Sequence, residues 1–398
     1  MTSKYAEAGV DFAQEHSVVD VIVKVGNETK ENIADLYNSG ISFPEEGNDF
    51  SGGISLDLEK MVNSGIKKTV LSGGVDGPGS KPVVHALYNG DDEIKLACTA
   101  IDSIAMCVND LICSGARPVL IYEYHSWNDA NLDVAKQMAG GKYIAAKLSK
   151  AAIVGGENAS LSAMITGPIP KKAYDMCNMA LGIITDEALV KNPLGKGRVQ
   201  SGDSVIGVSS SGIHCNGITM SWKAAIDFKN KGYIDSYKIN QRLAELGEES
   251  VAEAVLTPTI IYVDAILSVL EQYGSHIKAI ANITGEGIDN MKRILPENTG
   301  MILDYAQSYV QQPHPIFNWI QKNAVVSTQE MYHDYNQGTG MVLVVDKQHR
   351  NEIIHSLNQI GKNQIFQSNF KAYELGEIVP DVDSKIKGYA FDNTNLEF

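Results

Sequence analysis

The chain has 398 residues, of which 44% are hydrophobic, and a formal net charge of −15 from 33 Lys and Arg residues and 48 Asp and Glu residues. This length predicts two or three domains with a sizeable core, and the acidic charge argues against nucleic acid or an anionic membrane as the main partner. Because we find no window of about 20 apolar residues, no signal segment and no CxxC pair among the five cysteines, we expect a cytoplasmic protein without disulfides or structural zinc.

Runs of apolar, β-branched and aromatic residues predict strands that alternate with helical segments, as in an α/β protein. Each run ends near glycine or a cluster of polar residues, which is where strands commonly lead into functional loops. The predicted strands are 69–72, 118–124, 151–154, 175–184, 204–208 and 340–345.

Two helices are predicted with some detail. The first spans residues 102–114 and has one apolar face. The second begins at Thr257, which serves as N-cap before Pro258, and ends at Gly274.

Two polar stretches indicate how the chain is divided. Residues 191–202 contain a proline and three glycines, and this composition predicts a boundary between two α/β halves. We therefore expect an N-terminal domain over residues 1–190 and a C-terminal domain over residues 200–398. The Asn- and Glu-rich stretch 26–51 predicts an irregular insertion.

The loop after the first predicted strand, residues 75–81 with the sequence VDGPGSK, has the composition of a nucleotide site. Small residues let the backbone approach phosphate oxygens closely, and Lys81 carries a charge that neutralises phosphate. Asp76 is a candidate ligand for Mg²⁺, which takes oxygen ligands and bridges to phosphates. The order Ser80-Lys81 excludes a Walker A loop. Taken alone, the same residues also fit an ordinary Gly/Pro turn capped by an aspartate.

Three more acidic residues are candidates. We place Asp110 near the apolar face of the first helix, where an ionised carboxylate costs several kcal/mol unless it is paired or bound to metal. A Mg²⁺ ligand is therefore favoured over a capped or solvated residue, whereas Asp102 fits a simple N-cap. Glu157 follows a predicted strand in the turn Gly155-Gly156-Glu157, where a carboxylate could contact a ligand. The motif is weak evidence by itself, because many turns after strands have this composition.

The sequence SSSGIHCNG, residues 209–217, follows a predicted strand and precedes a helix. Hydroxyls, backbone amides and a helix N-terminus together suit a phosphate monoester, and a Ser-rich helix cap is the alternative. His214 is a candidate general acid or base, whereas Cys215 has no assignable base partner and is not expected to be a nucleophile. The other histidines show no metal-ligand spacing, and His349 and His355 are expected on the surface of a terminal helix.

In order and spacing, these motifs resemble the phosphoribosylformylglycinamidine cyclo-ligase family (aminoimidazole ribonucleotide synthetases), within an ATP-binding superfamily that includes selenophosphate synthetase. The run AMCVNDLICSGARP is the most specific match. The matching segments are YAEAGVD at 5–11, VDGPGSK at 75–81, AIDSIAMCVNDLICSGARP at 100–118, VGGE at 154–157, GDSVIGVSSSGIHCNG at 202–217, LTPTIIYV at 256–263, ANITGEG at 281–287, RILPENT at 293–299, IFNWIQ at 316–321 and QEMYHDYNQGTGM at 329–341.

The resemblance implies an α/β (α+β) fold of two domains, in which an N-terminal mixed-sheet domain forms a barrel in a homodimer and a C-terminal α/β domain closes the substrate cleft. It also implies an ATP cleft and Mg²⁺ held by Asp76 and Asp110. The other implied site residues are Gly77, Gly79, Lys81 and Asn109 at the nucleotide, Lys81, Glu157 and His214 in catalysis, and Ser209, Ser210, Ser211, Gly212, His214 and Asn216 at the substrate phosphate.

The implied reaction is the ATP-dependent ring closure of formylglycinamidine ribonucleotide to aminoimidazole ribonucleotide. Phosphorylation activates the formyl oxygen, a substrate nitrogen attacks the same carbon, and phosphate leaves, while the protein positions the reactants and excludes water. Differences from the usual family motifs, among them Ser160 in place of a carboxylate and an added charge at Glu286, leave an alternative open. In that alternative, a superfamily member activates an oxygen of a different small substrate with ATP.

Overall fold

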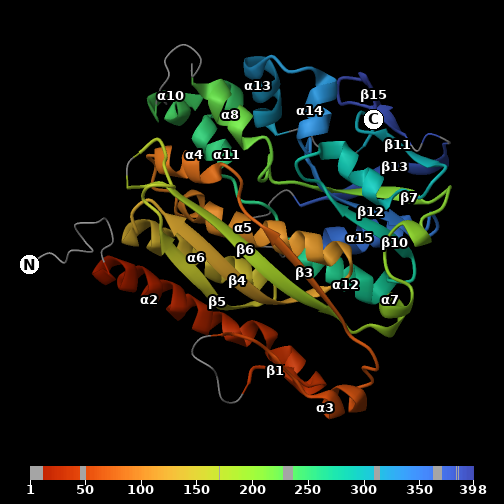
Figure 1. Cartoon of the computed structure of the whole chain (residues 1–398). Helices are drawn as coiled ribbons and strands as arrows, with labels where there is room; N and C mark the ends of the chain where they lie inside the picture. Colours follow the sequence, from red (N-terminus) through yellow and green to blue (C-terminus); the bar gives the residue numbers. More distant parts are fainter. Residues whose placement is uncertain are drawn as a thin grey trace, which may run out of the picture.

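The computed structural model describes residues 12–44, 51–169, 171–226, 236–308, 314–361, 370–381, 383 and 385–398. Two large β-sheets with flanking helices form two halves, which meet along the central helix α5 (Figure 1). The mixed α/β fold expected from the sequence is confirmed. The motif at residues 5–11 lies outside the described residues.

The N-terminal half is built on a four-stranded sheet in the order β3-β6-β4-β5, in which only the β4–β5 pair is parallel. Helices α5 and α6 pack on one face of this sheet. The elements of this half are α2 (Phe12–Thr29), η1 (Lys30–Ser39), β1 (Ile41–Ser42), β2 (Ser55–Leu56), α3 (Leu58–Asn63), β3 (Val70–Asp76), α4 (Lys81–Leu87), α5 (Glu93–Cys113), β4 (Arg117–Trp127), α6 (Leu132–Leu148), β5 (Ala152–Ser160), β6 (Tyr174–Ile184) and α7 (Glu187–Lys191).

The C-terminal half is built on a seven-stranded sheet in the order β10-β12-β7-β13-β11-β14-β15, in which only the β11–β14 pair is parallel. Its elements are η2 (Lys196–Arg198), β7 (Ser204–Ser209), α8 (Ile218–Ala225), α10 (Ser236–Asn240), β8 (Arg242–Leu243), η3 (Ala244–Leu246), β9 (Glu249–Ser250), α11 (Val251–Val255), α12 (Val263–Tyr273), β10 (Ile277–Asn282), η4 (Gly287–Ile294), β11 (Thr299–Asp304), α13 (Pro315–Ala324), α14 (Thr328–Asp334), β12 (Thr339–Val345), α15 (Arg350–Gly361), β13 (Ala372–Pro380), β14 (Ile386–Tyr389) and β15 (Asn395–Glu397).

The six predicted strands are all present, and β5 is longer than expected. It continues through residues 155–160, where the sequence predicts a turn, because these residues keep their pairing with residues 122–127 of β4. A Cβ added at Gly156 would lie only 2.2 Å from the carbonyl oxygen of Glu123. Glycine is therefore required here by the close approach of a neighbouring strand rather than by a turn.

The stretch expected to be irregular is helical where the structure describes it. Helix α2 reaches Thr29, and η1 follows directly. The backbone N–H of Ile153 donates to Thr29 Oγ1 at 2.9 Å, so polar residues of this segment bond to the neighbouring strand β5. The polar composition of this segment therefore reflects tertiary contacts. Residues 45–50 of the expected insertion lie outside the described residues.

Helix α5 begins earlier than predicted and lies inside the core. Its N-cap is Asp92, whose side chain accepts hydrogen bonds from the first turn, and Asp102 is ten residues inside the helix. The helix is long and apolar enough to cross a membrane, but 83% of the relevant window is buried inside the structure. One hydrophobic cluster joins α5 to Ile121 of β4, Ile206 of β7 and Ile266 of α12, so α5 is a core helix that both halves share.

Helix α12 begins at Val263 rather than at Pro258, and it ends before Gly274 as predicted. The late start has a tertiary cause, because backbone groups of residues 257–262 bond to side chains of α5 instead of to one another.

Candidate active site

The two carboxylates expected to hold Mg²⁺ approach each other at the C-terminal end of α5. Asp76 is the last residue of β3, and Asp110 lies in the last turn of α5. Cys107, one turn before Asp110, places its Sγ 3.6 Å from the carbonyl oxygen of Asp76. Burial raises the pKa of Asp76, and the charge of Asp110 raises it further. The two carboxylates are therefore close enough for their charges to interact.

Asp110 is exposed, whereas the sequence placed it near the buried face of the helix. The last turn of α5 emerges from the core here, and Asn282 Nδ2 of β10 donates to Asp110 Oδ1 at 2.8 Å. In the described part of the chain, neither Asp76 nor Asp110 forms an ion pair with a basic side chain. Paired carboxylates without a cationic partner fit the oxygen ligands that Mg²⁺ prefers.

Lys81 has a buried partner in place of the expected phosphate. Its Nζ donates to Asp102 Oδ2 at 2.7 Å and to the carbonyl oxygen of Thr257 at 3.0 Å, and both charged side chains are completely buried. Burial alone would lower the pKa of Lys81, but the Asp102 carboxylate outweighs it and raises the pKa above its ordinary value. The ammonium is therefore charged and already engaged. The sequence had assigned Asp102 only a capping role, and that assignment is wrong.

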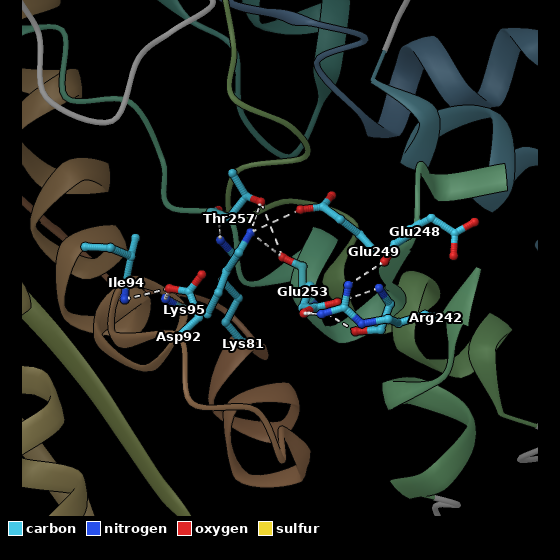
Figure 2. A network of polar contacts seen from close by, with 10 residues as sticks. Lys81, Asp92, Ile94, Lys95, Arg242, Glu248, Glu249, Glu253 and Thr257 are labelled. Atoms are coloured by element: carbon cyan, nitrogen blue, oxygen red, sulfur yellow. Dashed lines mark hydrogen bonds and ion pairs between the residues drawn. The ribbon is translucent and has the colours of Figure 1, made fainter. Parts of the chain in front are cut away.

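A second lysine binds the same turn. Lys95 Nζ donates to the carbonyl oxygen of Glu253 and to Thr257 Oγ1, both at 2.7 Å. Figure 2 shows Lys81 and Lys95 converging on Thr257, with Glu253 and Arg242 continuing the network. Burial lowers the pKa of Lys95. The two lysines thus connect the segment that follows α11, at Thr257, to the N-terminal half by hydrogen bonds.

Helix α5 holds the rest of this segment with two side chains. Asp102 Oδ1 accepts from the backbone N–H of Thr259 at 2.6 Å. Asn109 donates through Nδ2 to Ile260 O at 2.7 Å and accepts through Oδ1 from Tyr262 N at 3.0 Å. Asn109, expected beside the nucleotide, is therefore buried and fully engaged. Asp102 and Asn109 lie seven residues apart on one helical face, and this spacing was the signal that sequence reasoning missed.

The first serines of the 209–217 loop shape the loop itself. Ser209 ends β7, and its carbonyl oxygen accepts a hydrogen bond from Tyr262 Oη at 2.7 Å. Ser210 is buried, and its Oγ lies 2.9 Å from both Gly212 O and Asn336 Oδ1. The Ser210 hydroxyl is consequently engaged within the protein rather than facing a ligand.

His214 is also part of the loop's own framework. It is buried with a left-handed backbone, at a φ of 55°, and its Nε2 accepts from the backbone N–H of Ser211 at 3.3 Å. Burial, together with the charges of Lys81 and His314, lowers the pKa of His214 to about 3. The imidazole is neutral at physiological pH and has no proton to give from Nε2, which argues against the general-acid role.

The loop after β3 packs directly on the Ser-rich loop. A Cβ added at Gly79 would lie 3.2 Å from Cys215 O, and Gly79 has a left-handed φ of 59°. Ser80 Oγ lies 2.8 Å from Thr219 Oγ1. Asn216 Nδ2 is buried and has no hydrogen-bond partner within the described ranges. The structure therefore brings the two predicted loops together, and the Asn216 amide at this contact has an unused donor.

Glu157 lies elsewhere. It belongs to β5, at the sheet edge opposite β3, and strands β6 and β4 separate it from Asp76. With roughly 4.8 Å between neighbouring strands, the separation is about 14 Å. Glu157 pairs with Tyr124, on the sheet face that α5 and α6 do not cover. One chain alone does not bring Glu157 to the Asp76–Asp110 pair.

Comparisons with known proteins first define the class. The N-terminal domain of AIR synthase related proteins matches residues 69–184, and the C-terminal domain matches residues 200–388. The hydrogenase maturation protein HypE of E. coli superposes with a TM-score of 0.56 at 14% identity, covering 94% of this chain and 95% of that chain. A HypE structure in complex with ATP superposes with a TM-score of 0.54 at 13% identity, over 87% and 86% of the two chains. The fold is that of the AIR synthase related proteins.

Curated relatives narrow this class to one family. The phosphoribosylformylglycinamidine cyclo-ligase of Alkaliphilus metalliredigens is 32% identical over 359 residues, 90% of this chain and 92% of that protein. The enzyme of the same name from Coxiella burnetii is 32% identical over 375 residues, 94% and 92% of the two chains. The chain belongs to the phosphoribosylformylglycinamidine cyclo-ligase family, a family of ligases in purine biosynthesis, and the resemblance found in the sequence is confirmed.

Proposed function

We propose that this chain catalyses the ATP-dependent ring closure of formylglycinamidine ribonucleotide to aminoimidazole ribonucleotide, with release of ADP and phosphate. Nearly full-length similarity to proteins named for this reaction supports the proposal. The observation that carries it in the structure is the facing pair Asp76 and Asp110, which lacks a cationic partner in the described part of the chain.

Asp76 and Asp110 are the residues that would hold Mg²⁺. When bound, the ion supplies charge neutralisation to the phosphates of ATP. Asn282 orients Asp110 from the side through the hydrogen bond to Oδ1. The glycine-containing loop after Asp76 lets backbone approach the nucleotide, and Gly77 N–H already bonds to Asp76 Oδ1 at 2.7 Å.

The remaining site residues divide into positioning and binding roles. Lys81, Asp102 and Asn109 act as positioning residues, because they fix the segment 257–262 on which the Ser-rich loop rests. A hydrogen bond from Ser211 Oγ to the carbonyl oxygen of Pro258, at 2.5 Å, connects that loop to the segment. We assign the substrate phosphate to the partly exposed end of the loop, where Asn216 Nδ2 offers an unused donor.

A homodimer is the proposed assembly. One face of the N-terminal sheet exposes large apolar side chains, which is unusual for a sheet face left to water. Leu71 is 63% exposed and Val75 66%, and on the central strands Tyr124 and Met179 are 39% and 38% exposed. Packing against a second copy would cover this face. Glu157 lies on the same face, which supports a role at the subunit interface rather than beside Asp76.

Two of the differences from the usual family motifs are compensated locally, which favours this substrate over the alternative. Ser160 replaces a carboxylate, but its Oγ donates to the carboxylate of Glu15 from α2, so an acidic group is still present there. The extra charge of Glu286 is paired with Arg293 at 3.0 Å. The free thiols of all five cysteines support the proposed cytoplasmic location.

The test is turnover with the full chain. We expect protein, MgATP and formylglycinamidine ribonucleotide to form ADP and aminoimidazole ribonucleotide in equal amounts. Asp110→Asn should weaken Mg²⁺-dependent ATP binding at least about tenfold while the fold is kept, because one ligand is lost. Asp91→Asn, a change of the same kind at an exposed residue before α5, is the control. Tight ATP binding without aminoimidazole product would overturn the proposed substrate.

The same experiment has a pH dependence. Because burial and Asp110 raise the pKa of Asp76 above its ordinary value of 3.8, protonation removes this ligand at a less acidic pH than for an isolated aspartate. Mg²⁺-dependent ATP binding should therefore weaken as the pH falls toward the raised pKa. Unchanged binding down to the ordinary pKa would contradict the role of Asp76.

A further inference from the structure

A second group of metal-binding side chains lies in the C-terminal half. His276 directly precedes β10, Asp346 directly follows β12, and His349 lies just before α15. One ligand atom of each residue lies within 4.8 Å of the others. The antiparallel pairing of β10 with β12 brings the three together, although 73 residues separate the two histidines. Asn282 is at the other end of β10, about 20 Å away by strand rise, so this group is distinct from the Asp76–Asp110 pair.

The backbone fixes the relative positions of these residues. Asp346 N donates to His276 O at 2.9 Å, and His349 N donates to Asp346 O at 3.0 Å. The side chains themselves remain accessible, since those of His276 and Asp346 are 35% and 27% exposed. The cluster therefore combines a fixed backbone frame with two side chains, those of His276 and Asp346, that solvent partly reaches.

The cluster contains one anionic side chain, the carboxylate of Asp346. His276 Nδ1 lies 2.9 Å from Asp346 Oδ2, and Lys278 Nζ lies 2.7 Å from Asp346 Oδ1. Burial alone would raise the pKa of Asp346, but the bonds from Lys278 and His276 lower it, so the carboxylate is ionised at neutral pH. The charge of Lys278 also acts on the buried carboxyl of Asp203. The Asp346 carboxylate is thus the one anionic ligand that the cluster offers to a cation.

One ligand atom has no protein partner. His349 Nδ1 is buried and makes no hydrogen bond within the described ranges. A polar group that loses its water without gaining a new partner destabilises the fold by about 1–3 kcal/mol. The ring of His349 stacks on that of His276 with centroids 3.5 Å apart and an angle of 21° between the planes. A cation that accepts this nitrogen as a ligand would satisfy it.

We propose that His276, Asp346 and His349 bind one divalent transition-metal ion of the zinc class, with a further position open to solvent. Two imidazole nitrogens and one carboxylate oxygen form a ligand set that suits Zn²⁺, Ni²⁺ or Cu²⁺ and not Mg²⁺. The ion takes the place of the hydrogen bond between His276 Nδ1 and Asp346 Oδ2, and the imidazole then carries its hydrogen on Nε2. With bonds of about 2.1 Å, tetrahedral ligand atoms lie about 3.4 Å apart, whereas here they lie within 4.8 Å of one another. Binding therefore requires a closure of little more than 1 Å and a rotation of one of the two stacked rings, so that both nitrogens point at the ion.

The bound ion would tie the start of β10 to the turn between β12 and α15. The linker between the two halves docks at the same place, because Gly195 N donates to Lys278 O at 2.9 Å and Arg198 Nη1 donates to Ile277 O at 2.9 Å. Ion binding is therefore expected to stabilise the fold against unfolding, by an amount that grows with the free ion concentration.

The proposal is tested on untagged, chelator-treated full chain. We expect calorimetric titration with Zn²⁺ to give about one ion per chain, and Co²⁺ to give visible absorption bands of low-symmetry coordination. His349→Ala should weaken binding at least about tenfold and remove the Zn²⁺-induced rise in Tm, whereas excess Mg²⁺ should not compete. His355→Ala, an exposed histidine on α15, is the matched control and should bind as the unmodified chain does.

Circular dichroism checks that each variant is folded, and His276→Gln serves as the second variant if His349→Ala does not fold. Equal affinity in the unmodified chain and in a folded His349→Ala or His276→Gln variant would overturn the proposal, because the ion would then bind elsewhere. Failure of Zn²⁺ and Co²⁺ to bind the unmodified chain would overturn it as well.

Discussion

Two lysine–carboxylate pairs are buried on the helix-covered side of the N-terminal sheet, and they differ in how completely hydrogen bonds surround them. In the Lys81–Asp102 pair, the second carboxylate oxygen accepts a hydrogen bond from Thr259 N. In the Lys142–Glu123 pair, Nζ lies 2.9 Å from Oε2, but Oε1 has no partner in the part of the chain that the structure describes. Both pairs belong to the N-terminal half, but only the first also bonds to the other half, through Thr257 and Thr259.

The surroundings explain the difference. His125 Nε2 lies 3.0 Å from Lys142 Nζ, and the residues Glu123 and His125 line a cavity of about 160 Å³ between α2 and β5. Burial lowers the pKa of Lys142, whereas Asp102 raises the pKa of Lys81. A buried ion pair is thus a firm structural link where every donor and acceptor is used, and a weaker one where a cavity leaves room for water.

The largest effect is expected from breaking the complete pair. Asp102→Asn leaves the buried ammonium of Lys81 without a counter-charge, and the free energy of unfolding should fall by about 3–5 kcal/mol. Urea unfolding followed by circular dichroism measures this. Asp92→Asn on the same helix is the control, because asparagine caps a helix as well as aspartate does. A loss below about 1 kcal/mol for Asp102→Asn would contradict the assignment.

A smaller effect is expected from the incomplete pair. Lys142→Met leaves Glu123 without its cation, but water in the adjoining cavity can solvate the carboxylate, so we expect a loss of about 2–3 kcal/mol in the same unfolding assay. The double variant Lys142→Met with Glu123→Leu should recover most of this loss. If the single variant loses as much stability as Asp102→Asn, the cavity does not moderate the burial of charge.

The smallest effect is expected from an exposed pair. Arg117 binds both carboxylate oxygens of Asp35, at 2.6 and 2.7 Å, and the Asp35 side chain is 65% exposed. Asp35→Asn should cost less than about 1 kcal/mol.

The hydrogen bond from Arg117 lowers the pKa of Asp35, so its contribution is complete above the ordinary pKa of 3.8 and disappears as the pH falls through the lowered value. A difference between unmodified chain and variant that persists at lower pH would indicate another cause.

Local chemistry in the sequence was sufficient to predict several parts of the molecule. β-Branched runs located all six predicted strands, and oxygen-ligand chemistry selected Asp76 and Asp110, which the structure brings together. The start of α12 was not predictable in this way. The capping chemistry of Thr257 and Pro258 is sound, but side chains of α5 take up the backbone groups that a helix would use.

The buried partner of Lys81 was not predictable either. The same local sequence is compatible with an exposed Lys81 beside phosphates and with a buried Lys81 beside Asp102. Only the packing of α4 on α5 decides between the two. Likewise, Gly155-Gly156 fits both a turn and a crowded strand, and the decision depends on the neighbouring strand β4. Such choices depend on contacts between residues far apart in sequence.

The position of α5 in one hydrophobic cluster with both sheets limits how the molecule can open. A hinge rotation between the halves would expose apolar side chains of this cluster to water, at about 25 cal/mol for each Å². Large swinging motions of the halves are therefore disfavoured. The short loops after β3 and β7 border the site without belonging to that cluster, so a displacement of these loops would expose none of its side chains.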